Sequence, residues 1–175
     1  MPRLSAAGIS GLQAGEDVKE GNGMPAHAHA RNLRIGRRSI QGQIYLVTCA
    51  VRERAPVFAQ FHIGRMLVAQ LRCLHEAGAV NSLAWVVMPD HLHWLFELRS
   101  GSLSQLMQQL KGANAYAINR ACGNQTLRWQ KGYHDHAART QEQVLEMARY
   151  VIANPVRAGL VESEGDYPLW DCVWT

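Results

Sequence analysis

The feature that most restricts the possible folds is a pair of strand-like segments separated by only two residues. Residues 82–88 and 91–98 are rich in β-branched, aromatic and other apolar residues, which pack well on a pleated surface. Pro89 and Asp90 lie between the segments, and this dipeptide favours a turn because proline lacks a backbone donor and aspartate stabilises turns. We therefore expect an antiparallel hairpin whose second strand begins at His91.

Other segments predict the elements around this hairpin. The β-branched, apolar residues 43–51 predict a buried strand, and residues 58–77 carry apolar side chains at helical spacing. Two further helices are expected at residues 103–121 and 142–153, the second stopped by Pro155 because proline cannot continue the helical hydrogen bonds. The order strand, helix, strand, strand, helix, helix predicts an α+β domain, in which helices pack on an antiparallel β-sheet.

The chain has 175 residues, enough for one ordinary domain with a hydrophobic core. Residues 1–41 are rich in Gly, Ala and small polar residues and carry Arg34, Arg37 and Arg38, so we expect a flexible basic arm there. This charge cluster is either part of a solvated tail or part of a segment that binds along the phosphates of a nucleic acid. Residues 42–175 are expected to form the folded domain.

Composition limits the cellular setting and the partners. No uninterrupted apolar run approaches the roughly 20 residues that a membrane-spanning helix requires, and the first residues lack the pattern of a secretory signal. The four cysteines are scattered singly, without a C-x-x-C pair, and predict reduced thiols. We therefore expect a cytoplasmic protein without a membrane partner. A net charge of +4 fits a polyanionic partner but is weak evidence by itself.

Three H-x-H triplets occur in the chain: His27-Ala-His29, His91-Leu-His93 and His134-Asp-His136. Residues two apart on a strand point to the same face, so two imidazoles can bind one cation while the residue between them enters the core. Leu92 suits that buried position, and Trp94, Phe96 and Leu98 continue its face. Ala28 lies in the expected arm, and Asp135 would be a poor core residue. The central triplet is therefore the best candidate, although H-x-H alone more often marks two structural histidines.

A second candidate constellation lies near the end of the last helix. Tyr150 and Asn154 are four residues apart and therefore share one helix face. The amide oxygen of Asn154 suits a hard divalent ion, and Tyr150 can attack a phosphate that the same ion polarises. Spacing alone favours a simpler interpretation, in which the tyrosine belongs to the core and the asparagine ends the helix before Pro155.

Other tyrosines compete with Tyr150 as nucleophile. Tyr116 also lies on an expected helix, with basic residues at both ends, and spacing barely separates the two. Tyr133, in an expected loop, is not excluded. Tyr45 and Tyr167 are less favourable because one lies inside the first strand and the other precedes a proline.

Basic residues are interleaved with aromatic ones in a mixture that suits phosphates and stacked, unpaired bases. They are Lys111, Arg120, Arg128, Trp129, Lys131, Tyr133, Arg139, Arg149 and Arg157. A solvated surface also explains many of them. The sequence has no Gly-rich phosphate loop, G-x-S-x-G elbow or H-E-x-x-H helix, which argues against the common ATPase, hydrolase and zinc-protease classes.

Three ordered motifs, at residues 84–93, 129–136 and 150–161, together with the ending Asp166-Tyr-Pro-Leu-Trp170, resemble the REP-associated tyrosine transposases. These are relatives of the single-tyrosine HUH transposases. The resemblance covers about residues 42–170 and implies an HUH endonuclease fold with a ferredoxin-like or RRM-like core. It also implies that His91, His93 and Asn154 bind Mg²⁺ or Mn²⁺ and that Tyr150, rather than Tyr116, is the nucleophile.

The resemblance further implies a metal-dependent endonuclease and strand transferase that acts on single-stranded, REP-type DNA hairpins through a 5′-phosphotyrosine intermediate. Such a protein is expected to act as a monomer or weak dimer. The expected DNA-binding residues are Arg34, Arg37, Arg38, Lys111, Arg128, Lys131, Arg139, Arg149 and Arg157. The alternatives are a catalytically inactive hairpin-binding protein that retains the fold and a metal-binding protein unrelated to DNA.

Overall fold

The structure, a computed structural model, describes residues 39–123 and 127–174. The expected arm therefore lies almost wholly outside the described residues, including Arg34, Arg37 and Arg38. The described chain forms β1 (Ile44–Ala50), α1 (Phe61–Glu76), β2 (Val80–Met88), β3 (His91–Leu98), α2 (Leu103–Cys122), β4 (His134–Ala137), α3 (Gln141–Arg157) and β5 (Trp170–Cys172). Short 3₁₀ helices occupy Arg52–Arg54, Val57–Ala59 and Glu164–Asp166.

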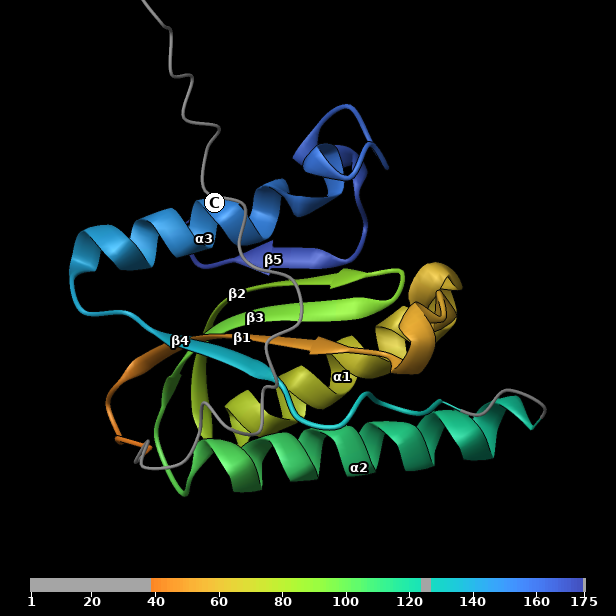
Figure 1. Cartoon of the computed structure of the whole chain (residues 1–175), viewed down its shortest axis with the longest axis horizontal. Coiled ribbons are helices and arrows are strands. Elements are labelled where there is room, and N and C mark those ends of the chain that lie inside the picture. Colours follow the sequence, from red (N-terminus) through yellow and green to blue (C-terminus); the bar gives the residue numbers. More distant parts are fainter. Residues whose placement is uncertain (1–38, 124–126, 175) are drawn as a thin grey trace, which may run out of the picture.

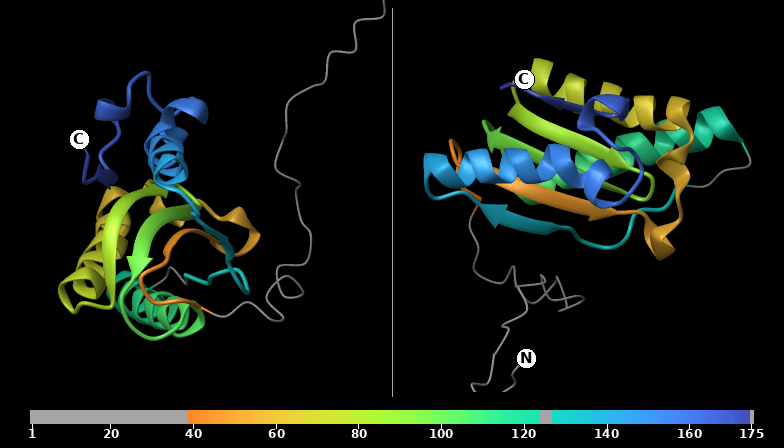
Figure 2. Two further views of the ribbon diagram at one scale, coloured as in Figure 1. Left: turned by 90° about the vertical axis from the view of Figure 1, so that its left-hand side faces the viewer. Right: turned by 90° about the horizontal axis from the view of Figure 1, so that it is seen from above.

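The strands form one antiparallel sheet in the order β4-β1-β3-β2-β5. The expected hairpin is confirmed, because β2 and β3 pair directly and only Pro89 and Asp90 separate them. Helix α3 lies on one face of the sheet, whereas α1 and α2 lie on the other (Figure 1; Figure 2, left). The predicted α+β class, with helices packed on an antiparallel sheet, is therefore confirmed.

Side-chain alternation along β3 divides the core between these two faces. Leu92, Trp94, Phe96 and Leu98 are fully buried in the cluster that includes α1 and α2. Leu95 points the other way and packs with residues of α3. The expectation that the residue between the two histidines enters the core is confirmed, and the histidines must occupy the face that α3 covers.

Truncating Leu92 should destabilise the fold through this core. Leu92 is 0% exposed, so Leu92→Ala leaves a cavity and should lower the free energy of unfolding by about 2–5 kcal/mol. Leu160→Ala is the matched control, because Leu160 is 45% exposed and its truncation should change stability far less. Urea unfolding measures both variants, and equal losses would contradict the assignment of Leu92 to the core.

Two strands and one helix end differ from the sequence expectations. Strands β4 and β5 were not expected, because each is short and lies at a sheet edge, where few apolar residues are needed. Tyr133 precedes β4 in a loop, but His134 begins the strand. Helix α3 does not stop before Pro155; it continues to Arg157.

No described helix combines the length and the apolar character needed to cross a membrane.

Candidate metal and nucleophile site

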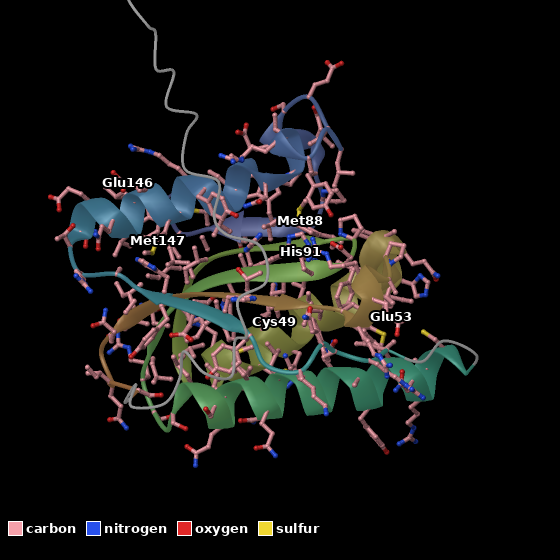
Figure 3. The ribbon with its side chains drawn as sticks, in the orientation of Figure 1. Cys49, Glu53, Met88, His91, Glu146 and Met147 are labelled. Atoms are coloured by element: carbon pink, nitrogen blue, oxygen red, sulfur yellow. The ribbon has the colours of Figure 1, made fainter. Side chains whose placement is uncertain are left out.

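The strand geometry of β3 brings His91 and His93 together on the face covered by α3. Their Nε2 atoms lie 3.1 Å apart, and the ring centroids are 4.7 Å apart with the planes nearly perpendicular. His91 opens the strand directly opposite Met88, at the hairpin end of the sheet (Figure 3). Both imidazoles therefore present the same nitrogen to one point in space.

The other nitrogen of each imidazole already has a polar partner. His91 Nδ1 lies 2.5 Å from Asp90 Oδ1, and His93 Nδ1 lies 2.7 Å from the hydroxyl of Thr48. A carboxylate only accepts hydrogen bonds, so it assigns the proton of His91 to Nδ1, and the Thr48 hydroxyl can accept from His93 in the same way. The Thr48 hydroxyl can also donate to His93 Nδ1, and His93 Nε2 then donates to His91 Nε2. When both protons are on Nδ1, the two Nε2 lone pairs face each other.

This arrangement fits a shared cation. The Nε2 atoms lie 3.1 Å apart, where they can share a hydrogen bond or, with both protons on Nδ1, face a common cation. Imidazole nitrogens are ordinary ligands of divalent metal ions, so the pair would suit one such ion.

Burial keeps both imidazoles neutral, which is the form that binds metal. His93 is only 6% exposed, and burial lowers its pKa to about 3, with the positive charges of His91 and Arg54 acting in the same direction. Burial also lowers the pKa of His91, and the neighbouring Asp90 opposes part of that shift. Near neutral pH neither histidine needs to lose a proton before it can bind a cation.

These shifts predict that acid destabilises the metal-free protein. The unfolded chain takes up a proton on His93 near pH 6.5, whereas the folded protein does not until about pH 3, so stability is highest above pH 6.5 and falls between these values. The expected slope is up to about 1.4 kcal/mol per pH unit for this histidine. Urea unfolding in EDTA at several pH values measures it, and His93→Gln should flatten the curve. An unchanged slope in His93→Gln would contradict the prediction.

Helix α3 brings Tyr150 to the histidine pair. The helix begins at the Thr140 cap, whose hydroxyl accepts a hydrogen bond from the backbone of Gln143, and it buries Val144, Ala148 and Val151 against the sheet. The Tyr150 ring lies 5.4 Å from the His93 ring, centroid to centroid, in an edge-on arrangement. The Arg157 guanidinium also lies over the Tyr150 ring, 5.5 Å from its centroid. The structure thus joins His93 and Tyr150, which spacing alone could not do.

Asn154 lies one helical turn beyond Tyr150 and is not a helix cap, in contrast to the simpler sequence interpretation. Pro155 has no N–H, so the carbonyl of Val151 loses its usual helical donor. The side-chain amide of Asn154 lies 3.4 Å from that carbonyl and donates to the carbonyl of Tyr150 at 2.6 Å. This commits Nδ2 to the helix backbone, and Oδ1 is the atom left for a cation. The helix can therefore pass through Pro155 to Arg157.

The metal shell would need this amide oxygen. Within residues 39–123 and 127–174, no cluster of three or more His, Cys, Asp or Glu side chains is arranged to hold a metal ion. Two imidazoles therefore need a ligand of another kind, and an amide oxygen suits a hard divalent ion. Two imidazoles and an amide oxygen are ligand types that would suit Mg²⁺ or Mn²⁺, and the recorded hydrogen bonds of Asn154 go to the helix backbone.

The competing tyrosines lie elsewhere. Tyr116 is 67% exposed on α2, which covers the opposite face of the sheet, and its hydroxyl accepts a hydrogen bond from Arg120. Tyr133 and Tyr45 are buried in the cluster that includes α1 and α2. Tyr167 is half-buried and donates to the carbonyl of Val87. Tyr116 and Tyr150, which sequence spacing left nearly equivalent, therefore lie on opposite faces of the sheet.

The expected DNA-binding residues are unevenly placed. Arg128, Lys131, Arg139, Arg149 and Arg157 are exposed. Lys111 is half-buried, donates to the carbonyls of Gln130 and Gly132, and lies 5.8 Å from the Trp129 ring. Its contacts serve the fold, whereas the exposed arginines and lysine remain available for phosphates.

Sequence reasoning missed three residues that support the histidines. Thr48 faces His93 because β1 and β3 pair in that register, and register cannot be deduced from the strand itself. Asp90 was interpreted only as a turn residue. Arg54, which forms an ion pair with Asp90 at 2.7 Å, lies in a segment with no regular pattern. A carboxylate directly before an H-x-H triplet was the one signal that could have indicated this support.

Comparisons with known proteins identify the family of the chain. The family model described as "Transposase IS200 like" matches residues 39–154. The REP-associated tyrosine transposase of Escherichia coli (strain K12) is 31% identical over 87 residues, which cover 49% of this chain and 50% of that protein. The match therefore spans about half the length of that relative. A putative REP-associated tyrosine transposase of Haemophilus influenzae is 24% identical over 140 residues, covering 73% of this chain and 78% of the relative.

A solved structure has a similar fold. A REP-associated tyrosine transposase bound to a REP hairpin superimposes with a TM-score of 0.64 at 26% identity, covering 77% of this chain and 79% of the other. The family model extends from the residues before β1 to Asn154 in α3 and so includes the histidine pair and Tyr150. The chain therefore belongs to the IS200-like transposase family, and the resemblance to REP-associated tyrosine transposases is confirmed.

Proposed function

We propose that the chain is a metal-dependent, single-stranded DNA endonuclease and strand transferase that recognises REP-type hairpins. The observation that carries the proposal is a pair of neutral imidazoles whose Nε2 atoms lie 3.1 Å apart, with the ring of Tyr150 against that of His93. Beside a tyrosine nucleophile, such a pair suits phosphoryl transfer.

In the proposed reaction, Tyr150 attacks the scissile phosphorus in line. The tyrosine oxygen forms a bond to phosphorus, the phosphorus–O3′ bond breaks, the phenol releases its proton and the departing O3′ takes one up. The products are a 5′-phosphotyrosine and a free 3′-OH, so the phosphoester energy is retained for rejoining. A Mg²⁺ or Mn²⁺ ion held by His91, His93 and Asn154 would supply a Lewis acid that offsets charge on the phosphoryl oxygens.

The proposed partner is a DNA hairpin with a single-stranded flank. A related protein was solved bound to a REP hairpin, and the exposed basic residues of this chain can bind phosphates. Arg149 lies on α3 with Tyr150, and the Arg157 guanidinium lies over the Tyr150 ring, so we propose that they contact the strand that is cut. We propose a monomer or weak dimer as the working unit, since Tyr150 contacts His93 within one chain.

The test uses a hairpin oligonucleotide with single-stranded flanks, labelled at each end in separate experiments, and Mn²⁺. Cleavage with a covalent protein–DNA adduct on a denaturing gel would support the proposal, and an unstructured strand of equal length is the control. Affinity should also fall steeply as salt rises, because phosphate contacts release counterions. Tight hairpin binding that is insensitive to EDTA, without scission, would instead indicate a catalytically inactive hairpin-binding protein.

A further inference from the structure

The segment that follows β1 adopts an unusual backbone conformation beside the histidine pair. Glu53 and Arg54 have φ values of 58° and 55°, in the left-handed region that residues other than glycine rarely adopt. Such residues persist only where the surroundings hold them. Here the backbone of Val51 donates to the carbonyl of Asp90 at 2.8 Å, and that of Phe58 donates to the carbonyl of Pro89 at 2.8 Å. The segment is thus fastened to the β2–β3 turn on both sides.

This conformation places Arg54 against the carboxylate that supports His91. Arg54 Nε lies 2.7 Å from Asp90 Oδ2, while Asp90 Oδ1 lies 2.5 Å from His91 Nδ1. The Asp90 side chain is 19% exposed, and each of its two oxygens contacts one of these partners. A continuous line of contacts therefore runs from Arg54 through Asp90 to His91 and ends at the Nε2 atom that faces His93.

We propose that Arg54 and Asp90 are positioning residues that orient His91 for the cation. Asp90 holds the proton of His91 on Nδ1 and fixes the rotation of the ring, so that Nε2 keeps its lone pair toward His93. Arg54 occupies the second carboxylate oxygen and so prevents Asp90 from rotating away from the ring. The consequence for metal binding rests on the proposed function, whereas the orientation of His91 rests on these contacts alone.

The second histidine provides an internal control. His93 Nδ1 is held by the Thr48 hydroxyl, which belongs to β1 rather than to the segment of Arg54 and Asp90. Loss of Asp90 should therefore disturb His91 directly and His93 less, through the 3.1 Å contact between their Nε2 atoms. General weakening of the fold would affect both rings.

The first measurement is the tautomer of each histidine in the metal-free protein, from ¹⁵N chemical shifts. In Asp90→Ala, the Nδ1–H form of His91 should lose population to the Nε2–H form, and the change at His93 should be smaller, because only the Nε2–Nε2 contact joins the two rings. Asp90→Asn keeps an acceptor oxygen for His91 but loses the ion pair with Arg54, so it should show a smaller change. Unchanged His91 signals in Asp90→Ala, or equal changes at both histidines, would overturn the proposal.

The second measurement is Mn²⁺ affinity, by calorimetry or by the electron paramagnetic resonance of free Mn²⁺. Loss of a residue that orients a metal-bound histidine typically weakens binding by about 10- to 100-fold, which is the expectation for Asp90→Ala. Arg54→Ala should weaken binding less, by roughly 10-fold or below. Arg52→Ala is the matched control, because Arg52 lies in the same segment with the same 59% side-chain exposure but pairs with Glu53 instead. It should bind Mn²⁺ like the wild type.

A double-mutant cycle tests whether Arg54 acts through Asp90. If it does, Arg54→Ala should have no further effect on Mn²⁺ affinity in the Asp90→Ala background. Additive effects would show that Arg54 acts independently and would overturn its assignment as a positioning residue. If the wild-type protein binds no Mn²⁺, the proposed function fails, but the tautomer measurement still decides whether Asp90 orients His91.

Discussion

Replacing Tyr150 by phenylalanine is expected to abolish the covalent protein–DNA adduct while hairpin binding persists. The substitution removes only the hydroxyl, so the ring can still pack against the edge of His93 and beneath Arg157. Without that oxygen no phosphotyrosine can form. Strand cleavage should fall on the order of 10⁴- to 10⁶-fold, as when one member of a catalytic unit is removed. Labelled hairpin DNA on a denaturing gel measures adduct and cleavage together.

The matched control for this prediction is Tyr116→Phe. It removes an identical hydroxyl from a tyrosine that is 67% exposed on the opposite face of the sheet. Adduct formation should be unchanged. Adduct that survives in Tyr150→Phe, or that disappears in Tyr116→Phe, would show that the nucleophile has been assigned to the wrong helix.

Removing either histidine of the pair should eliminate Mn²⁺ binding and metal-dependent cleavage. His91→Ala or His93→Ala leaves one imidazole and one amide oxygen, too few protein ligands for a stable site. The loss of affinity should exceed the roughly 10- to 100-fold that follows removal of a residue that only orients a ligand. EDTA should have the same effect on cleavage in the wild-type protein, and hairpin binding should persist in each case.

His136→Ala is the matched control, because His136 belongs to another H-x-H triplet on the same sheet face. His136 pairs with Leu46 of β1, and Leu46 pairs with Leu95 of β3, so the three residues share one face of the sheet. His136 is exposed on the edge strand β4. Its removal should leave Mn²⁺ affinity at the wild-type value. Cleavage that resists EDTA would contradict the metal requirement, and equal loss of affinity in all three variants would contradict the choice of triplet.

The histidine pair could be predicted because a strand has the simplest of all periodicities. Alternation along β3 requires Leu92 and Trp94 to share one face and His91 and His93 to share the other, whatever the neighbouring strands do. The hairpin could be predicted because Pro89 and Asp90 favour a turn between the two strands. These local rules fixed the orientation of the pair before any tertiary contact was known.

The partners of the pair depend on contacts that no local rule determines. Thr48 meets His93 only through the register of β1 against β3, and Tyr150 meets His93 only because α3 lies on that face of the sheet. Local spacing treated Tyr116 and Tyr150 alike. The resemblance to the family favoured Tyr150, and the structure places the Tyr150 ring against His93 and Tyr116 on the opposite face of the sheet.

Strand β4 illustrates a different limit. Its sequence, His-Asp-His-Ala, has little apolar character, and its histidines are exposed. It forms a strand because β1 offers an unpaired edge, with Tyr45 to Thr48 facing Ala137 to His134. Pairing of this kind reflects the neighbour rather than the segment, so the intrinsic preference of the residues gives no warning of it.

Pro155 should affect the outcome of substitutions at Asn154. Because residue 155 contributes no amide hydrogen, the carbonyl of Val151 is left to the side chain of Asn154. Any other residue at 155 would supply a backbone donor and release one of the two acceptors that hold the Asn154 amide. The phenotype of a change at 154 should then depend on the residue at 155, although Pro155 itself is buried against the sheet. Substitutions at positions 154 and 155 are therefore expected to be non-additive, so mutational scans of this helix must interpret them jointly.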